Sequence, residues 1–292
     1  MNFQALPYII LTGVAFGANL VALRFAIGEF EPFALAGLRL AVASLAFLIV
    51  YLVDPRHHPW PTNRNLWRHI LLVGTVGTAV PQVATVLSLQ YQSSGITAIL
   101  VATGPALTVL VAHFALADER LSWRKGMGVT AALGGALLLT LRGETGLPDI
   151  TQTSPMGYGL IFLVLICVTF VTIYTRKYLR AFKPFDLVSM QMFISTLVVM
   201  PFVVILTGVN LQGVSGPGYI ALAFTSLVGN FTAFLLYYYS IHRFGATTAA
   251  MTNYVIPAAA LLGGVFILNE TVTFGMMAGM GIIVFGISLV SS

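Results

Sequence analysis

Long apolar runs separated by short polar breaks fill the chain. Ten of these runs reach about 18 to 24 residues, the length that an α-helix needs to cross the hydrocarbon core of a bilayer. The runs are apolar throughout rather than alternating, so they do not favour membrane β-strands. The predicted spans cover residues 6–27, 33–53, 67–89, 94–116, 123–141, 156–177, 185–207, 217–240, 246–267 and 273–291.

Composition supports the same class. Hydrophobic residues make up 58% of the 292 residues and charged residues only 8%, which is too little polarity to cover a water-soluble surface. The sequence therefore predicts an all-α integral membrane protein, multi-pass, in the inner (cytoplasmic) membrane of the cell. Its expected partners are the lipid bilayer and a small-molecule substrate, with no nucleic acid. Cys167 is the one cysteine, so an internal disulfide is excluded.

The placement of basic residues tests the number of spans. The chain has 14 Lys and Arg. Ten alternating spans put Arg24 and Arg142 on one side of the membrane and leave Arg39 inside a span. The other eleven share the opposite side, which predicts that side and both termini to be cytoplasmic. They are Arg56, Arg64, Arg68, Arg120, Arg124, Lys125, Arg176, Lys177, Arg180, Lys183 and Arg243.

The chain also repeats itself. Its two halves share one pattern of glycine, proline and glutamate at an offset of 150 to 152 positions. Two five-helix units, residues 1–145 and 146–292, are therefore expected within one transmembrane domain. Because five is odd, the second unit enters from the opposite face, and the inverted repeats surround a central cavity typical of alternating-access transporters. The paired residues are Gly95, Pro105, Glu119, Gly128 and Gly135 with Gly245, Pro257, Glu270, Gly279 and Gly286.

Polar residues inside the spans indicate where a substrate would bind. Thr78, Gln82 and Thr85 share one face of the third predicted helix. At an offset of 152 they correspond to Asn230, Phe234 and Tyr237, which share one face of the eighth. Two related faces are what a central cavity needs. The alternative is that these side chains form hydrogen bonds that hold neighbouring helices together.

Two prolines and several aromatic residues add candidates. Pro105 and Pro257 fall at mid-span, where proline frees a backbone carbonyl near Val101 and near Asn253. These positions are predicted hinges and ligand contacts, or else packing kinks. Phe16 and Phe170, together with Phe234 and Tyr237, lie deep enough in their spans to stack on an aromatic or cationic ligand, or simply to pack.

The motifs resemble those of the drug/metabolite transporter superfamily, in its EamA-type branch of ten-helix exporters. The resemblance is carried by Phe16-Gly17-Ala18-Asn19 and Arg39-Leu40-Ala41, by Pro105 through Glu119 to Gly135, and by Pro257, Glu270 and Gly279 to Gly286. It implies export of small metabolites through a central cavity, and is greatest to the exporters of aromatic amino acids. It also implies a role in the cavity for Phe16 and Asn19. The second half departs from the pattern, with Phe170-Val171 in place of Ala18-Asn19, so we expect an asymmetric cavity.

The positions of the charged residues limit the kinds of substrate that the protein could carry. All nine carboxylates fall in loops or at span ends, which predicts a facilitator rather than a proton-coupled antiporter. Glu119 and Glu270 are expected to end helices and to pair with Arg120 or a nearby loop. Arg39, two turns into its helix, is expected to snorkel to the interface. A neutral, zwitterionic or mildly cationic substrate then fits best, such as an amino acid with a large apolar side chain. An exporter of varied cationic drugs is the alternative.

Other classes of protein have less support. The five histidines show no metal-ligand spacing within a helix, and no nucleophile or metalloprotease motif is present. We therefore expect no enzyme activity, catalytic residue, metal or cofactor. A scaffold would not need an inverted repeat with matching polar faces. A monomer is favoured.

Overall fold

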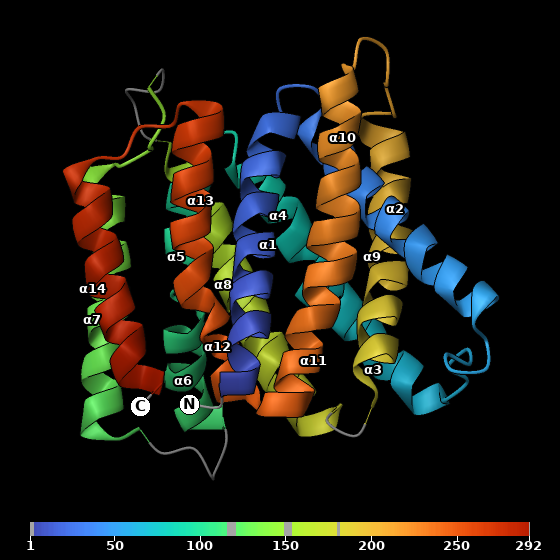
Figure 1. The fold of residues 1–292 in the computed structure, drawn as a ribbon, viewed down its shortest axis with the longest axis horizontal. Helices are drawn as coiled ribbons and strands as arrows, with labels where there is room; N and C mark the ends of the chain where they lie inside the picture. The colour runs from blue at the N-terminus through green and yellow to red at the C-terminus, as the bar shows by residue number, and fades with distance from the viewer. Residues whose placement is uncertain (1–2, 116–120, 149–153, 180–181, 292) are drawn as a thin grey trace.

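The computed structural model describes residues 3–115, 121–148, 154–179 and 182–291. All the regular secondary structure in these ranges is helical, and the helices form one bundle that runs between two faces (Figure 1). In chain order the elements are η1 (Phe3–Ala5), α1 (Leu6–Ala26), α2 (Pro32–Val53), α3 (Arg64–Gly74), η2 (Thr75–Ala79), α4 (Val80–Ser88), α5 (Ser94–Val101), α6 (Gly104–Ala115), α7 (Trp123–Arg142), α8 (Pro155–Tyr178), α9 (Pro184–Leu206), α10 (Gly216–Phe224), η3 (Thr225–Ala233), α11 (Phe234–Phe244), α12 (Ala246–Ala250), α13 (Thr252–Leu268) and α14 (Phe274–Ser291).

These elements form ten helical spans that match the predicted ones closely at both ends. The third span is α3–η2–α4, the fourth α5–α6, the eighth α10–η3–α11 and the ninth α12–α13. Eight of the spans are long and apolar enough to cross a membrane, and α14 is a shorter apolar helix. The prediction of an all-α membrane protein is confirmed.

Local sequence sets the helix ends. Glu31 accepts a hydrogen bond from the Ala34 backbone N–H at 2.6 Å, and Pro32 begins α2. Ser93 caps α5 through the Ile96 N–H, and Ser122 caps α7 through the Lys125 N–H. These side chains satisfy N–H groups that the first helical turn leaves without a partner. At its other end α7 stops at Gly143, whose φ of 66° suits glycine.

The contact between α7 and α14 joins the fifth and tenth spans, which lie side by side in Figure 1. Gly128 lies against Gly286, and Gly135 lies against Gly279. A side chain at any of the four would meet atoms of the other helix, so the absence of a Cβ lets the two backbones approach closely. Gly128 is the equivalent of Gly279, and Gly135 is the equivalent of Gly286. Exchanging the two halves therefore converts each contact into the other, as expected for a two-fold relation.

Contacts nearer the centre follow the same relation. Ser44 of α2 and Thr196 of α9 stand 152 positions apart and share a hydrogen bond of 2.8 Å. They are therefore each other's equivalents, and the pseudo-two-fold axis passes close to them. The inverted arrangement predicted from the odd number of helices per half accounts for these paired contacts.

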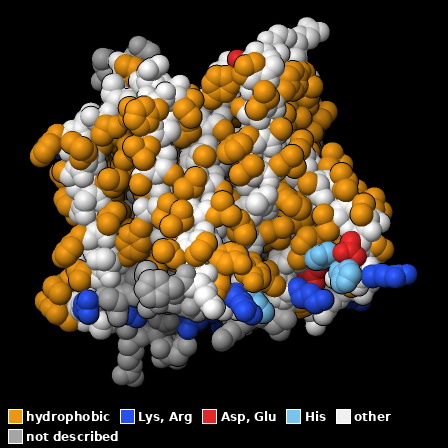
Figure 2. Space-filling model, viewed as in Figure 1, with side chains coloured by type: hydrophobic (Ala, Val, Ile, Leu, Met, Phe, Trp, Pro, Cys, Tyr) orange, Lys and Arg blue, Asp and Glu red, His pale blue; other side chains and the backbone are white. Residues whose placement is uncertain are grey.

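The two faces differ in charge. The N- and C-termini lie at the same lower edge in Figure 1, and Lys and Arg side chains gather along that edge in Figure 2, beneath a broad hydrophobic belt. We call this edge the basic face. Arg120 and Arg180, two of the eleven basic residues assigned to it from sequence, lie outside the described residues.

The glycine contact generates a test of the fold. In G286A the new methyl group would meet the backbone of Gly128 and Ala132, which cannot move aside as a flexible side chain can. We expect this variant to lose about 1–3 kcal/mol of stability, measured by thermal unfolding of the detergent-purified protein. G281A is the matched control on the same helix, because nothing lies within 4 Å of its added Cβ. Equal stability of the two variants would contradict the packing.

Candidate functional site

Two π-helical segments interrupt the third and eighth spans at equivalent positions. They are η2 and η3, and each contains a glycine, Gly77 or Gly229. Gly77 lies against Val171 of α8, whereas Gly229 lies against the carboxamide of Asn19 in α1. Val171 and Asn19 are themselves equivalent positions, so the same close contact between two spans occurs once in each half of the repeat. Segments of this kind occur often at functional sites.

Asn230 of η3 lies at the centre of a buried set of hydrogen bonds. Its Oδ1 accepts one from Arg39 Nη2 and one from Gln82 Nε2, both at 2.9 Å. Asn19 Oδ1 accepts a longer one from Arg39 Nη2, at 3.4 Å. Asn230 is 0% exposed and Arg39 1%. We call these four residues, Asn19, Arg39, Gln82 and Asn230, the central polar network.

The position of Arg39 corrects the prediction made from sequence. Its side chain does not snorkel to the interface, but turns inward from α2 and is held by amides from two other spans. Distance from the helix end was a poor guide because η3 packs directly against α2. The inward direction gave the guanidinium hydrogen-bond acceptors that the hydrocarbon cannot offer.

A second, neutral network stands in the equivalent place. Gln191 of α9 corresponds to Arg39, and Thr78 of η2 corresponds to Asn230. Thr78 Oγ1 donates to Gln191 Oε1 at 3.1 Å, so the equivalent residues are again joined, with donor and acceptor exchanged relative to Arg39 and Asn230. Gln191 Nε2 also donates to the Tyr238 hydroxyl at 3.3 Å. Both contacts therefore join the two halves across the repeat interface, and only one of them is charged.

Aromatic side chains lie beside the central polar network. Phe16 meets Phe234 edge to face with ring centroids 5.4 Å apart, and meets Tyr237 at 6.2 Å. All three are half-buried. Phe170 is not part of this cluster: it is 46% exposed and stacks on Tyr174. Its side chain therefore lies apart from the aromatic residues with which it was predicted to line the cavity.

Most of the remaining predicted site residues lie near breaks in the fourth and ninth spans. The fourth span breaks after Val101, and Pro105 lies in the first turn of α6. The ninth span breaks at Met251, ahead of Pro257, which is buried inside α13. Asn253 donates from Nδ2 to the Ala250 carbonyl across this break at 3.0 Å. Thr85 is half-buried, one turn beyond Gln82.

Glu270 makes a contact that sequence reasoning missed. Its carboxylate accepts hydrogen bonds from the Ser94 N–H and the Ser94 hydroxyl, both at 2.8 Å, and a longer one from the Gly95 N–H. It therefore caps α5 of the other half. A carboxylate is favourable at a helix N-terminus. This contact joins the two halves at the face opposite the basic face. Its equivalent, Glu119, lies outside the described residues.

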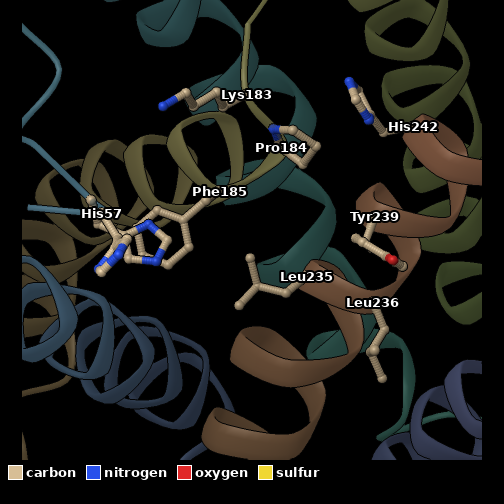
Figure 3. A pocket seen from close by; sticks show the side chains of 9 residues that line it. His57, Lys183, Pro184, Phe185, Leu235, Leu236, Tyr239 and His242 are labelled. Carbon is tan, nitrogen blue, oxygen red and sulfur yellow. The ribbon is translucent and has the colours of Figure 1, made fainter. Parts of the chain in front are cut away.

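A cavity of about 460 Å³ opens near the basic face between α9 and α11. Figure 3 shows Phe185 and Leu235 along its apolar wall, with Lys183 and His242 at its rim. Hydrogen bonding to His57 lowers the pKa of the neighbouring Asp54 carboxyl. The full lining is His57, His58, Lys183, Pro184, Phe185, Leu235, Leu236, Tyr239 and His242.

Ten helical spans in two inverted halves, with polar side chains buried at their interface, define a membrane transporter. The chain belongs to the EamA-like transporter family, which matches residues 4–141 and again residues 155–292. Family and relatives are transporters, not enzymes.

Similar proteins cover nearly the whole chain. An uncharacterized transporter of Archaeoglobus fulgidus is 23% identical over 96% of both chains. The uncharacterized inner membrane transporter YedA of Escherichia coli K12 is 27% identical over 95% of this chain and 87% of its own. A solved crystal structure shares the fold with a TM-score of 0.64 and 15% identity, covering 96% of this chain and 95% of that one.

The central polar network predicts that replacing Asn230 by aspartate stabilises the protein. N230D would place a carboxylate where Asn230 Oδ1 now accepts from Arg39, and so would pair the buried guanidinium. We expect the free energy of unfolding to rise by about 1–3 kcal/mol, because hydrogen bonds between charged groups are the stronger ones. Thermal unfolding would measure it. N210D, in an exposed loop, is the control; a fall in stability for N230D alone would contradict the assigned contact.

Proposed function

We propose that this protein exports small amphipathic metabolites, amino acids including aromatic ones, by alternating access at the interface between its halves. The observation that carries the proposal is the pair of equivalent networks, Arg39 with Asn230 and Gln191 with Thr78. A substrate bound between them contacts both halves. Exchange of the two halves' conformations would then move the opening from one face to the other.

The contact of Glu270 with Ser94 supports a cycle of this kind. It joins the loop before α14 to the start of α5, and so links the two halves on the face opposite the basic face. Opening that face requires its hydrogen bonds to part. The breaks before Pro105 and at Met251 lie in the two spans that this motion would bend, since a span without continuous backbone hydrogen bonding bends readily.

The two kinds of side chain at the centre support an amphipathic substrate. Phe16, Phe234 and Tyr237 offer aromatic surface, on which an apolar side chain can stack. The central polar network offers a positive charge and amide groups for the polar end. The positive charge of Arg39 disfavours the alternative of a cationic-drug exporter, because like charges repel strongly where water is excluded.

Charge also supports the orientation. With the basic face in the cytoplasm, as the positive-inside rule predicts, the cavity beside Lys183 and His242 faces the cytoplasm and supplies a route for outward transport. Both termini are then cytoplasmic. Arg39 keeps its proton at any physiological pH, so the proposal remains a facilitator driven by the substrate gradient.

Counterflow tests this function. Proteoliposomes preloaded with unlabelled phenylalanine should take up labelled phenylalanine without any ion gradient. N230A should lower the initial rate at least about 10-fold, because it removes the acceptor that Arg39 and Gln82 share. N210A, in an exposed loop, should leave the rate unchanged. Exchange that depends on an imposed proton gradient, or that N230A leaves intact, would contradict the proposal.

A further inference from the structure

Three buried polar atoms at the centre of the bundle have no hydrogen-bond partner among the residues that the structure describes. They are Nε and Nη1 of Arg39 and Nδ2 of Asn230. All three are donors, and they lie on two side chains that are hydrogen-bonded to each other. Buried donors are normally satisfied, so the centre lacks an acceptor.

The missing acceptor should carry negative charge. In the described part of the chain no Asp or Glu forms an ion pair with Arg39, and the acceptors that it does have are neutral amide oxygens. An arginine keeps its charge at physiological pH. A charge buried within a membrane bundle without an opposite charge is costly, and such residues are typically kept for function.

A purely structural role does not require this charge. The equivalent position in the other half holds Gln191, which links α9 to η2 through Thr78 by the same kind of contact. A neutral amide therefore suffices to join the helices at this level. What Arg39 adds beyond Gln191 is a positive charge and extra N–H groups.

We propose that Arg39, together with Asn230, binds the carboxylate of the transported molecule; this rests on the transport function proposed above and assigns one part of its site. A carboxylate offers about four lone-pair positions, enough to accept from several of the unpartnered donors at once. The single positive charge of the Arg39 guanidinium balances the single negative charge of a carboxylate, and the neutral Asn230 amide adds one more donor. The aromatic cluster of Phe16, Phe234 and Tyr237 then receives the apolar part of the same molecule.

The packing around Arg39 also indicates which conformation of the protein can bind the carboxylate. Nε and Nη1 are closed off from solvent in the present arrangement, and Asn19 lies tightly between α2 and Gly229 of η3. The carboxylate therefore reaches the guanidinium when η3 moves away from α1. Asn230 and Asn19 hold Arg39 in the absence of substrate, and the carboxylate replaces part of that contact.

Matched ligands can test the charge directly. The purified protein would be unfolded by heat with 3-phenylpropionate, with its neutral amide 3-phenylpropanamide, and with phenethylamine, which share one ring. We expect 3-phenylpropionate to raise the unfolding temperature in a saturable way. The amide and the amine should show an apparent affinity at least about 10-fold weaker, and so should raise the unfolding temperature less at equal concentration. Acetate, benzoate, phenylalanine and inorganic phosphate complete the series.

Variants then assign the effect to one residue. R39Q should lose the carboxylate-dependent shift yet remain folded, because a glutamine is accommodated at the equivalent position 191. R39K should retain a weaker shift, since it keeps the charge but not the planar set of donors. S44A is the matched control: it removes a buried hydrogen bond from the same helix and should respond as the wild type does.

Any one of several results would overturn the inference. They are equal protection by the carboxylate and its amide, an R39Q variant that still responds to carboxylates, and a wild-type protein that no carboxylate protects. Stronger Arg39-dependent protection by phosphate would assign the site to another anion and also contradict it. The transport function is tested separately. Phenylalanine counterflow that R39Q leaves intact would preserve that function and refute the site, whereas carboxylate protection without counterflow would preserve the site and refute the function.

Discussion

The Arg39 guanidinium is buried among helices, and no Asp or Glu in the described part of the chain pairs with it. This constraint governs how the centre of the bundle is arranged. Arg39 cannot lose its proton and cannot face hydrocarbon, so neighbouring spans must supply acceptors. Asn230 does so from a π-helical segment, and Gln82 shares the same oxygen. Glycine at position 229 leaves room for Asn19 to join them. The π-helical segment η3 thus lies where the charge is held, and η2 lies at the equivalent neutral contact.

The inverted repeat explains why the centre is polar on both sides but charged on only one. Arg39 and Gln191 are equivalent, as are Asn230 and Thr78, and both contacts join one half to the other. The glycine contacts between α7 and α14 obey the same relation. In the transport cycle proposed above, a symmetric framework with one asymmetric charge would adopt two related conformations and present a single site for the polar end of a substrate.

Much of the fold could be predicted because membrane helices obey simple rules of length and charge. The ten spans followed from apolar runs, and the direction of the repeat from their odd number in each half. The site was harder. Thr78, Gln82 and Asn230 were visible as polar residues inside spans, but nothing in the spacing of Arg39 separated an inward side chain from a snorkelling one. The contact of Glu270 with Ser94 joins residues 176 positions apart, and no local pattern reports it.

The most direct measurement is of the distance between the two halves on the face where Glu270 joins them. Spin labels at positions 90 and 271, both exposed beside that contact, would be introduced in a Cys167→Ser background and measured in liposomes with and without phenylalanine. Alternating access predicts two distance populations whose proportions shift when phenylalanine is added. A single distance that phenylalanine leaves unchanged would contradict the account.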